Sequence, residues 1–214
     1  MGDEDFPAEA AERTDRPVVT IFESYGSGAS VVGPRVAQLL GVPFLGQAFS
    51  SEDLEQLEGR ERSGLARVLS VVGRGAGAAE TAAGVGEDQE YEDTLANVRR
   101  LRTAAADGVV VVGRNATVIL GDLENAIHVK LDGPLEQRLD RAAAEAGISR
   151  AEAARRQARE DRMRAEMSLR LHNWDPRRND RFDLVINTGT MSLETAARLV
   201  VANHRLLTAA RRRH

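Results

Sequence analysis

Short runs of apolar residues alternate with longer stretches of mixed apolar and charged residues along most of the chain. Runs rich in β-branched residues predict strands over 17–22, 108–113, 126–131 and 183–187. Because most positions in these runs are apolar, we expect the strands to be buried on both faces. The pattern therefore predicts an α/β fold, with a central parallel sheet flanked by helices.

Helices are predicted where apolar residues recur at intervals of three or four positions. The first helix follows a glycine-rich turn and ends at Gly41. Ser149 followed by Glu152 forms a capping-box pattern, which predicts that a helix starts there. The later helices are predicted over 135–146, 150–171 and 193–207.

Composition separates one domain from two charged tails. Residues 1–16 are rich in Asp, Glu, Ala and Pro and have no apolar period, so we expect a solvated acidic tail. Residues 17–207 form the predicted domain, and residues 208–214 form a basic tail.

The composition of the 214-residue chain also excludes several classes of site and partner. There is no cysteine, so disulfides, thiolate zinc sites and iron–sulfur clusters are excluded. A net charge of -4 gives no global basic field, so we do not expect a nucleic-acid partner. No run approaches the roughly 18 apolar residues of a membrane span, and the acidic start differs from a signal peptide. We therefore expect no membrane partner and a cytoplasmic location.

A glycine-rich turn between a buried strand and a helix can hold phosphate on its backbone N–H groups. In the general P-loop pattern G-x-x-x-x-G-K-[ST], this chain has Glu23 in place of the first glycine and Ala29 in place of the lysine. The single lysine, Lys130, lies in a predicted strand and cannot replace that charge. A tight turn without a ligand is the alternative interpretation. The predicted cofactor-binding residues are Gly26, Ser27, Gly28, Ala29 and Ser30.

Arginines supply the predicted catalytic residues. Arg114 follows the strand 108–113, so we expect it at the carboxyl end of the sheet, where ligands of open α/β folds bind. Arg162 and Arg164 lie on the arginine-rich helix and would reach the same crevice if that helix folds over it. Guanidinium groups suit phosphate because their donors form a fork. Surface salt bridges are the alternative use of these residues.

Several motifs follow one another in a familiar order. They occupy residues 19–33, 40–44, 111–116, 134–138 and 183–188. Together these motifs resemble the cytidylate-kinase-like proteins, a branch of the P-loop nucleoside monophosphate kinases, over about residues 17–205. The resemblance implies a three-layer P-loop kinase-like fold with a helical acceptor-binding insert near 46–106 and a lid near 147–180.

The resemblance also implies roles for the candidate residues. The turn from Gly26 to Ser30 would hold the phosphates of ATP, with the Ser30 hydroxyl as the candidate ligand for Mg²⁺. Arg114 would bind the acceptor nucleotide, and Arg162 with Arg164 would bind phosphates in the closed state. The chain departs from the active enzymes at Ala29, where they carry lysine, and at Val112, where they carry aspartate.

These observations leave three hypotheses. The first is a phosphotransferase that passes the terminal phosphate of ATP to CMP or a related small acceptor. The second is a catalytically inactive pseudokinase that acts as a nucleotide-sensing or protein-interaction module, and the third is a purely structural interaction domain. Glu23 discriminates between them, because a carboxylate that points into the turn disfavours triphosphate binding. If Glu23 turns away to pair with an arginine, the first two hypotheses recover.

Overall fold

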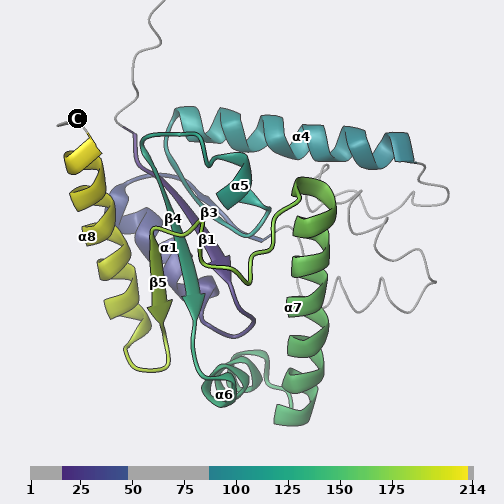
Figure 1. Ribbon diagram of the computed structural model, residues 1–214. Helices are drawn as coiled ribbons and strands as arrows, with labels where there is room; N and C mark the ends of the chain where they lie inside the picture. Colours follow the sequence, from purple (N-terminus) through teal and green to yellow (C-terminus); the bar gives the residue numbers. More distant parts are fainter. Residues whose placement is uncertain (1–15, 48–86, 212–214) are drawn as a thin grey trace, which may run out of the picture.

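The computed structural model of the chain describes residues 16–47 and 87–211. Within these residues, five strands form one sheet in the order β2-β3-β1-β4-β5 (Figure 1). Every adjacent pair of strands is parallel, which confirms the predicted parallel sheet. The strands are β1 Val18–Glu23, β2 Phe44–Leu45, β3 Val109–Val112, β4 Ala126–Asp132 and β5 Leu184–Asn187.

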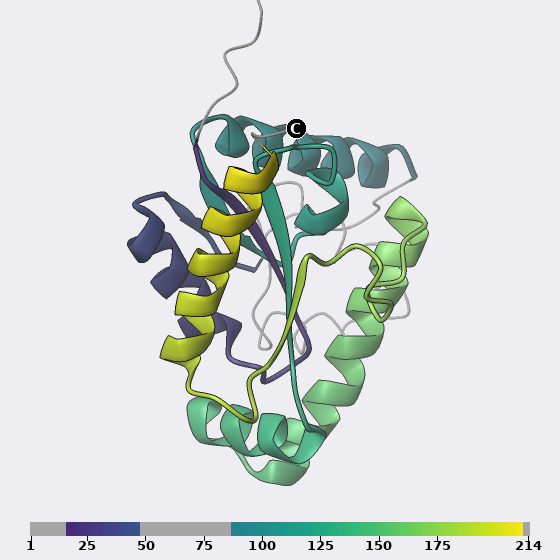
Figure 2. The same ribbon diagram turned by 60° about the vertical axis from the view of Figure 1, so that its left-hand side comes forward.

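Helices cover both faces of the sheet, as the views in Figures 1 and 2 show. On one face, α1 and α8 pack against a core that includes Ile21 and Val129. On the other face, Leu101 of α4 packs with Val109 and Val111 of β3. The α6 and α7 helices lie near the carboxyl ends of the strands. The helices are α1 Ala29–Leu40, α4 Glu87–Ala106, α5 Ala116–Ile119, α6 Leu135–Ala146, α7 Arg150–His172 and α8 Leu193–Arg211.

The ends of the helices follow local sequence signals. The Ser149 hydroxyl accepts a hydrogen bond from the Glu152 N–H at 3.1 Å, which confirms the predicted cap of α7. Gly41 ends α1 in a left-handed conformation, with φ of 69°. The α8 helix continues to Arg211, beyond the predicted end at 207, and the Arg211 guanidinium donates to the carbonyl of Ala126 at 2.6 Å. This tertiary contact anchors the last turn of the helix.

Parts of the expected insert and tails lie outside the described residues. The expected insert, 46–106, is described only at residues 46–47 and 87–106. The tail up to residue 15 and residues 212–214 are also outside the described part. The expected lid, 147–180, contains α7.

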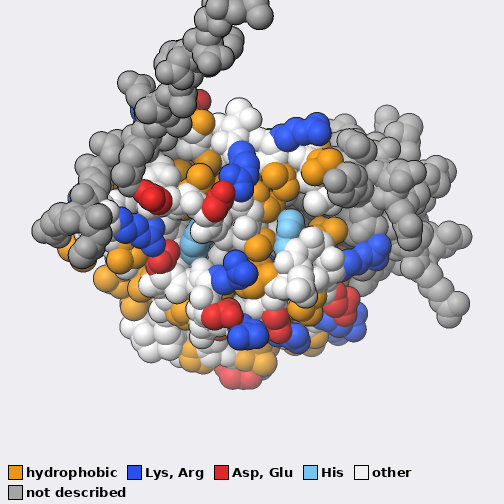
Figure 3. Space-filling view, turned by 45° about the horizontal axis from the view of Figure 1, so that its top comes forward, with side chains coloured by type: hydrophobic (Ala, Val, Ile, Leu, Met, Phe, Trp, Pro, Cys, Tyr) orange, Lys and Arg blue, Asp and Glu red, His pale blue; other side chains and the backbone are white. Residues whose placement is uncertain are grey.

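Charged side chains of both signs lie on the face of the molecule that Figure 3 shows. Where α4 and the end of α8 come forward, basic and acidic side chains are interspersed rather than gathered by sign (Figure 3). Among the described residues, no helix combines the length and apolar character that crossing a bilayer requires.

Candidate functional site

The loop between β1 and α1 has the strand–glycine–helix geometry that the sequence predicts. Gly26 and Gly28 both adopt positive φ, of 77° and 90°, a region that favours glycine. A Cβ on Gly26 would lie 2.3 Å from the carbonyl oxygen of Arg138, and one on Gly28 would lie 2.6 Å from a methyl carbon of Leu193. Backbone packing against α6 and positive φ therefore require glycine at position 26, and at position 28 the positive φ is the main requirement.

Glu23 points into the cradle that this loop forms. Its Oε1 accepts hydrogen bonds from the backbone N–H groups of Gly28 and Ala29, both at 3.1 Å. Its Oε2 accepts from the Nε2 of Gln47 at 2.7 Å. Amides at a helix N-terminus are the donors that otherwise bind phosphate. The Glu23 carboxylate thus takes the position that the sequence analysis associated with loss of triphosphate binding.

Opposing effects act on the ionisation of Glu23. Burial raises its pKa above the usual 4.5. The positive charge of Arg164 and the two loop amides lower the pKa, but the effect of burial is larger. The carboxylate is therefore protonated more readily than an exposed glutamate, although its hydrogen-bond donors suit the ionised form.

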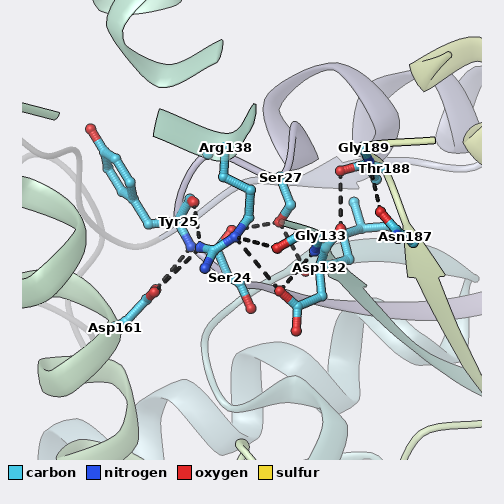
Figure 4. Close-up of polar contacts among 12 residues, drawn as sticks. Ser24, Tyr25, Ser27, Asp132, Gly133, Arg138, Asp161, Asn187, Thr188 and Gly189 are labelled. Atoms are coloured by element: carbon cyan, nitrogen blue, oxygen red, sulfur yellow. Dashed lines mark hydrogen bonds and ion pairs between the residues drawn. The ribbon is translucent and has the colours of Figure 1, made fainter. Parts of the chain in front are cut away.

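A second carboxylate holds the same loop. The Oδ1 of Asp161, from α7, accepts from the N–H of Tyr25 at 2.9 Å. Arg138, from α6, donates to the carbonyl of Tyr25 at 2.8 Å, and Figure 4 shows its guanidinium between the loop and Asp161. Arg141 donates to the carbonyl of Gly26 at 2.8 Å. Side chains of α6 and α7 therefore bind the peptide groups of the loop directly.

A cleft of about 480 Å³ opens beside the loop. Its apolar wall includes Tyr25, Phe44 and Val112. Both charge signs are present on the remaining wall, so the cleft lacks the strongly positive lining that a triphosphate would favour. The charged residues of the lining are Glu23, Glu145, Arg156, Glu160 and Arg164.

The structure brings only one of the predicted catalytic arginines to this cleft. Arg164 lines it and is held by Glu160 at 2.7 Å and by the Oε1 of Gln47 at 3.2 Å. Arg162 is not among the residues that line the cleft, its side chain is 67% exposed, and it pairs with Glu166 at 3.9 Å.

Arg114 is also not among the lining residues of the cleft. Its Nε donates to the carbonyl of Gly46 at 2.8 Å, so it fixes the chain that follows β2. Burial lowers the pKa of Arg114, and the nearby positive charge of Arg100 lowers it further. Arg114 therefore holds the backbone after β2, and its role in acceptor binding stays a prediction.

The hydroxyl groups of the predicted cofactor-binding residues are hydrogen-bonded to other parts of the protein. Ser30 lines the cleft, but its hydroxyl donates to Glu145 at 2.6 Å. The Ser27 hydroxyl donates to the carbonyl of Leu131 at 2.8 Å and is buried. Ala29 has no polar side-chain atom to replace the missing lysine. Among the described residues, no group of three or more histidine and carboxylate side chains could hold a metal ion.

Several side chains that hydrogen-bond the loop after β1 or its neighbours could not be identified from the sequence. Gln47 and Glu145 belong to no motif, so no signal marked them. Arg138 lies within one of the segments that carry the family resemblance. Asp161 lies on the arginine-rich helix, and no local signal indicates that it accepts from the N–H of Tyr25.

Comparison with solved structures shows the fold. An uncharacterized protein from Eubacterium ventriosum has a TM-score of 0.64 at 16% identity, over 89% of this chain and 99% of that protein. A gluconokinase from Sinorhizobium meliloti has a TM-score of 0.50 at 18% identity, over 91% of this chain and 94% of that one. The predicted P-loop kinase-like fold is thereby confirmed.

Half of the chain is similar to a segment of a larger protein, and most of the chain matches one family. The chain is 42% identical over 108 residues to a uronate isomerase from Corynebacterium glutamicum, a match that covers 50% of this chain but only 21% of that protein. The model of the cytidylate kinase-like family matches residues 18–190. The chain therefore belongs to the cytidylate kinase-like family.

Proposed function

We propose that this protein is a catalytically inactive, nucleotide-sensing member of its family. The two hydrogen bonds that Glu23 accepts from the amides of Gly28 and Ala29 carry the inactive part of this proposal, because a carboxylate in the loop disfavours triphosphate binding. Membership of a kinase-like family supports the nucleotide part. A ligand phosphate needs these amides, so it must first displace the carboxylate. Binding would then change the contacts of the loop, and that change is the signal the protein provides.

Displacing Glu23 has a substantial energetic cost. Hydrogen bonds to a charged group contribute about 1.5–3 kcal/mol each, and Glu23 accepts two from the loop and one from Gln47. A phosphate that enters without displacing the carboxylate meets a like charge at close range. Triphosphate binding to the wild-type protein is therefore expected to be weak.

The cofactors that the family implies do not fit the residues in place. Active relatives use ATP with Mg²⁺, whereas here Ala29 replaces the lysine and the Ser30 hydroxyl is bonded to Glu145. One preorganised group that stabilises a transition state contributes about 3 kcal/mol, or 10² to 10³ in rate. The absence of the lysine together with an occupied loop favours binding without phosphoryl transfer.

Two further observations support a sensing role. The cleft of about 480 Å³ is within the ordinary range for a small-molecule site, and Tyr25 and Phe44 offer aromatic surface for a base. The related segment of the uronate isomerase is a fifth of that protein, which supports a role as a module attached to other activities.

The test is to titrate ATP and CMP by calorimetry, with and without Mg²⁺, into wild type, Glu23→Ala and Glu166→Ala. Glu166 is an exposed residue of α7 outside the cleft lining, so its replacement removes the same charge without freeing the loop. We expect Glu23→Ala to bind ATP at least tenfold more tightly than wild type, since about 1.4 kcal/mol suffices for that factor. Glu166→Ala should bind like wild type, and none of the proteins should form ADP.

A phosphotransferase that uses ATP and CMP is the second candidate function. Two observations favour it: Arg164 lies in the cleft with its charge acting on Glu23, and burial raises the pKa of Glu23, which makes its neutral form more accessible. Steady formation of ADP by wild type in the presence of CMP, absent in Arg164→Gln, would establish this activity and refute the inactive state. Equal ATP affinity of wild type and Glu23→Ala would refute the proposal that Glu23 blocks phosphate binding at the amides of Gly28 and Ala29.

A further inference from the structure

A second cavity, of about 400 Å³, lies at the other end of the sheet, near the start of β4. No residue that lines it also lines the cleft beside the loop. Figure 3 turns this end of the molecule forward and shows basic, acidic and histidine side chains close together on the surface. The polar residues of its lining are Thr117, Asp122, Glu124, His128, Asp180, Arg181, Asp183 and Arg211.

Most carboxylates of this cavity are already bonded within the protein. Asp122 accepts from the Arg102 guanidinium on both of its oxygens, at 3.0 and 3.1 Å. Asp180 is paired with an arginine of the same loop at 3.2 Å. Asp183 accepts from Arg211 at 3.1 Å and from the backbone N–H of His128 at 2.7 Å. Their negative charge is therefore largely balanced before a ligand arrives.

Arg181 differs from these residues. Within the described part of the chain its guanidinium makes no hydrogen bond or ion pair. Its positive charge nevertheless reaches His128: burial has the largest effect and lowers the pKa of that imidazole, Asp183 raises it, and Arg211 and then Arg181 lower it further. Arg181 is thus an uncommitted cation at the wall of the cavity.

The imidazole of His128 is oriented by a chain of two hydroxyls. Its Nδ1 is 2.8 Å from the Oγ1 of Thr20, which lies 3.1 Å from the Oγ1 of Thr117. Both threonines are buried, so this chain holds the ring firmly. The Nε2 of His128 has no hydrogen-bond partner among the described residues.

We infer that this cavity binds a small organic anion, a carboxylate or phosphate group contacting Arg181 and the Nε2 of His128. An anion at Nε2 requires the proton on that nitrogen, and the hydroxyl chain provides for it when Thr117 donates to Thr20 and Thr20 donates to Nδ1. Leu123 and Phe182 also line the cavity and offer apolar surface for the body of the ligand. This site is separate from the proposed nucleotide site.

The test follows the imidazole nitrogens of the full chain by NMR, in protein labelled with ¹⁵N-histidine, with the His128 signal assigned from His128→Gln. Benzoate supplies a carboxylate on an apolar body, benzamide is its neutral counterpart, and inorganic phosphate tests the anion alone. We expect saturable perturbation of the His128 Nε2 signal by benzoate and none by benzamide. A response to inorganic phosphate as well would extend the ligand class to phosphates, and its absence would restrict it to carboxylates.

Arg181→Gln and Arg205→Gln form a matched pair of variants. Each removes one exposed arginine, but Arg205 lies on α8 outside the lining of the cavity. A charge-assisted hydrogen bond of ordinary strength corresponds to a loss of about ten- to hundredfold in benzoate affinity for Arg181→Gln. Arg205→Gln should bind like wild type. Equal binding of benzoate and benzamide, equal affinities of the two variants, or no saturable response to either anion would overturn the inference.

Discussion

Arg138 connects α6, α7 and the loop after β1, and its replacement measures how firmly that loop is held. Its side chain is 10% exposed and donates to the carbonyls of Tyr25 and Gly133 at 2.8 and 3.0 Å. It also lies 3.5 Å from Asp161, the residue that caps the N–H of Tyr25 (Figure 4). Arg138→Met keeps most of the apolar volume and removes every one of these bonds.

The expected loss of stability in Arg138→Met follows from the polar groups that lose Arg138 as a partner. Two carbonyls lose a charged donor, and a hydrogen bond to a charged group contributes about 1.5–3 kcal/mol, so the expected loss is about 3–6 kcal/mol for the two bonds. Asp161 keeps Arg164 at 3.4 Å, so its charge retains a partner. Urea unfolding followed by circular dichroism measures this loss, and thermal unfolding should show a decrease of roughly 6–24 °C at 2–4 °C per kcal/mol. The m-value should stay unchanged, because the surface exposed on unfolding is the same.

Arg150→Met is the matched control for Arg138→Met. Arg150 also pairs with carboxylates of α6, including Asp140 at 2.9 Å, but its side chain is 51% exposed. Solvent-exposed pairs contribute about 0–1 kcal/mol, so this variant should remain close to wild type. Equal losses for the two variants, or a loss below 1 kcal/mol for Arg138→Met, would refute the role assigned to burial.

Two further predictions concern pH and helix capping. Because burial raises the pKa of Glu23 above 4.5, its contribution to stability is complete below pH 4.5 and is lost as the pH rises through the raised value. The stability of Glu23→Gln minus that of wild type should therefore increase between pH 4.5 and 8 in urea titrations, whereas a constant difference would contradict the raised pKa. Ser149→Ala removes the cap of α7 and should cost about 1 kcal/mol in the same assay, while Ser192→Gly, at the start of α8, should cost only a few tenths.

Four of the five strands, the layers and the main helices could be predicted because they follow from local patterns. β2 was not predicted, because its two residues are too few to show a pattern. β3 consists of four buried valines, and the Ser149 cap is a contact across three residues. The α5 helix was missed because its four residues are too short to show a period. The end of α8 was placed too early because Arg211 is anchored by backbone carbonyls of the loop before β4 and of its first residue, which no local pattern encodes.

The sequence predicts the backbone of the candidate site, but not the directions of the side chains around it. The two glycines identify the loop, because positive φ and close packing restrict those positions to glycine. The direction of Glu23 depends on Gln47, which is distant in sequence and belongs to no motif. The arginines were harder still, since 28 of the 29 basic residues are arginine and the pattern does not separate Arg164, which reaches the cleft, from Arg162, which is exposed.

The contacts of the loop explain how the fold persists although the lysine position holds Ala29. Buried amides and carbonyls require partners, and in this chain they find them in its own side chains. Glu23 and Asp161 bind the N–H groups, and Arg138 binds a carbonyl. A phosphate that enters has to replace the two hydrogen bonds that Glu23 accepts from the amides of Gly28 and Ala29. These two bonds stabilise the loop without a ligand and also weaken ligand binding, so a substitution of Glu23 that increases nucleotide affinity should decrease stability.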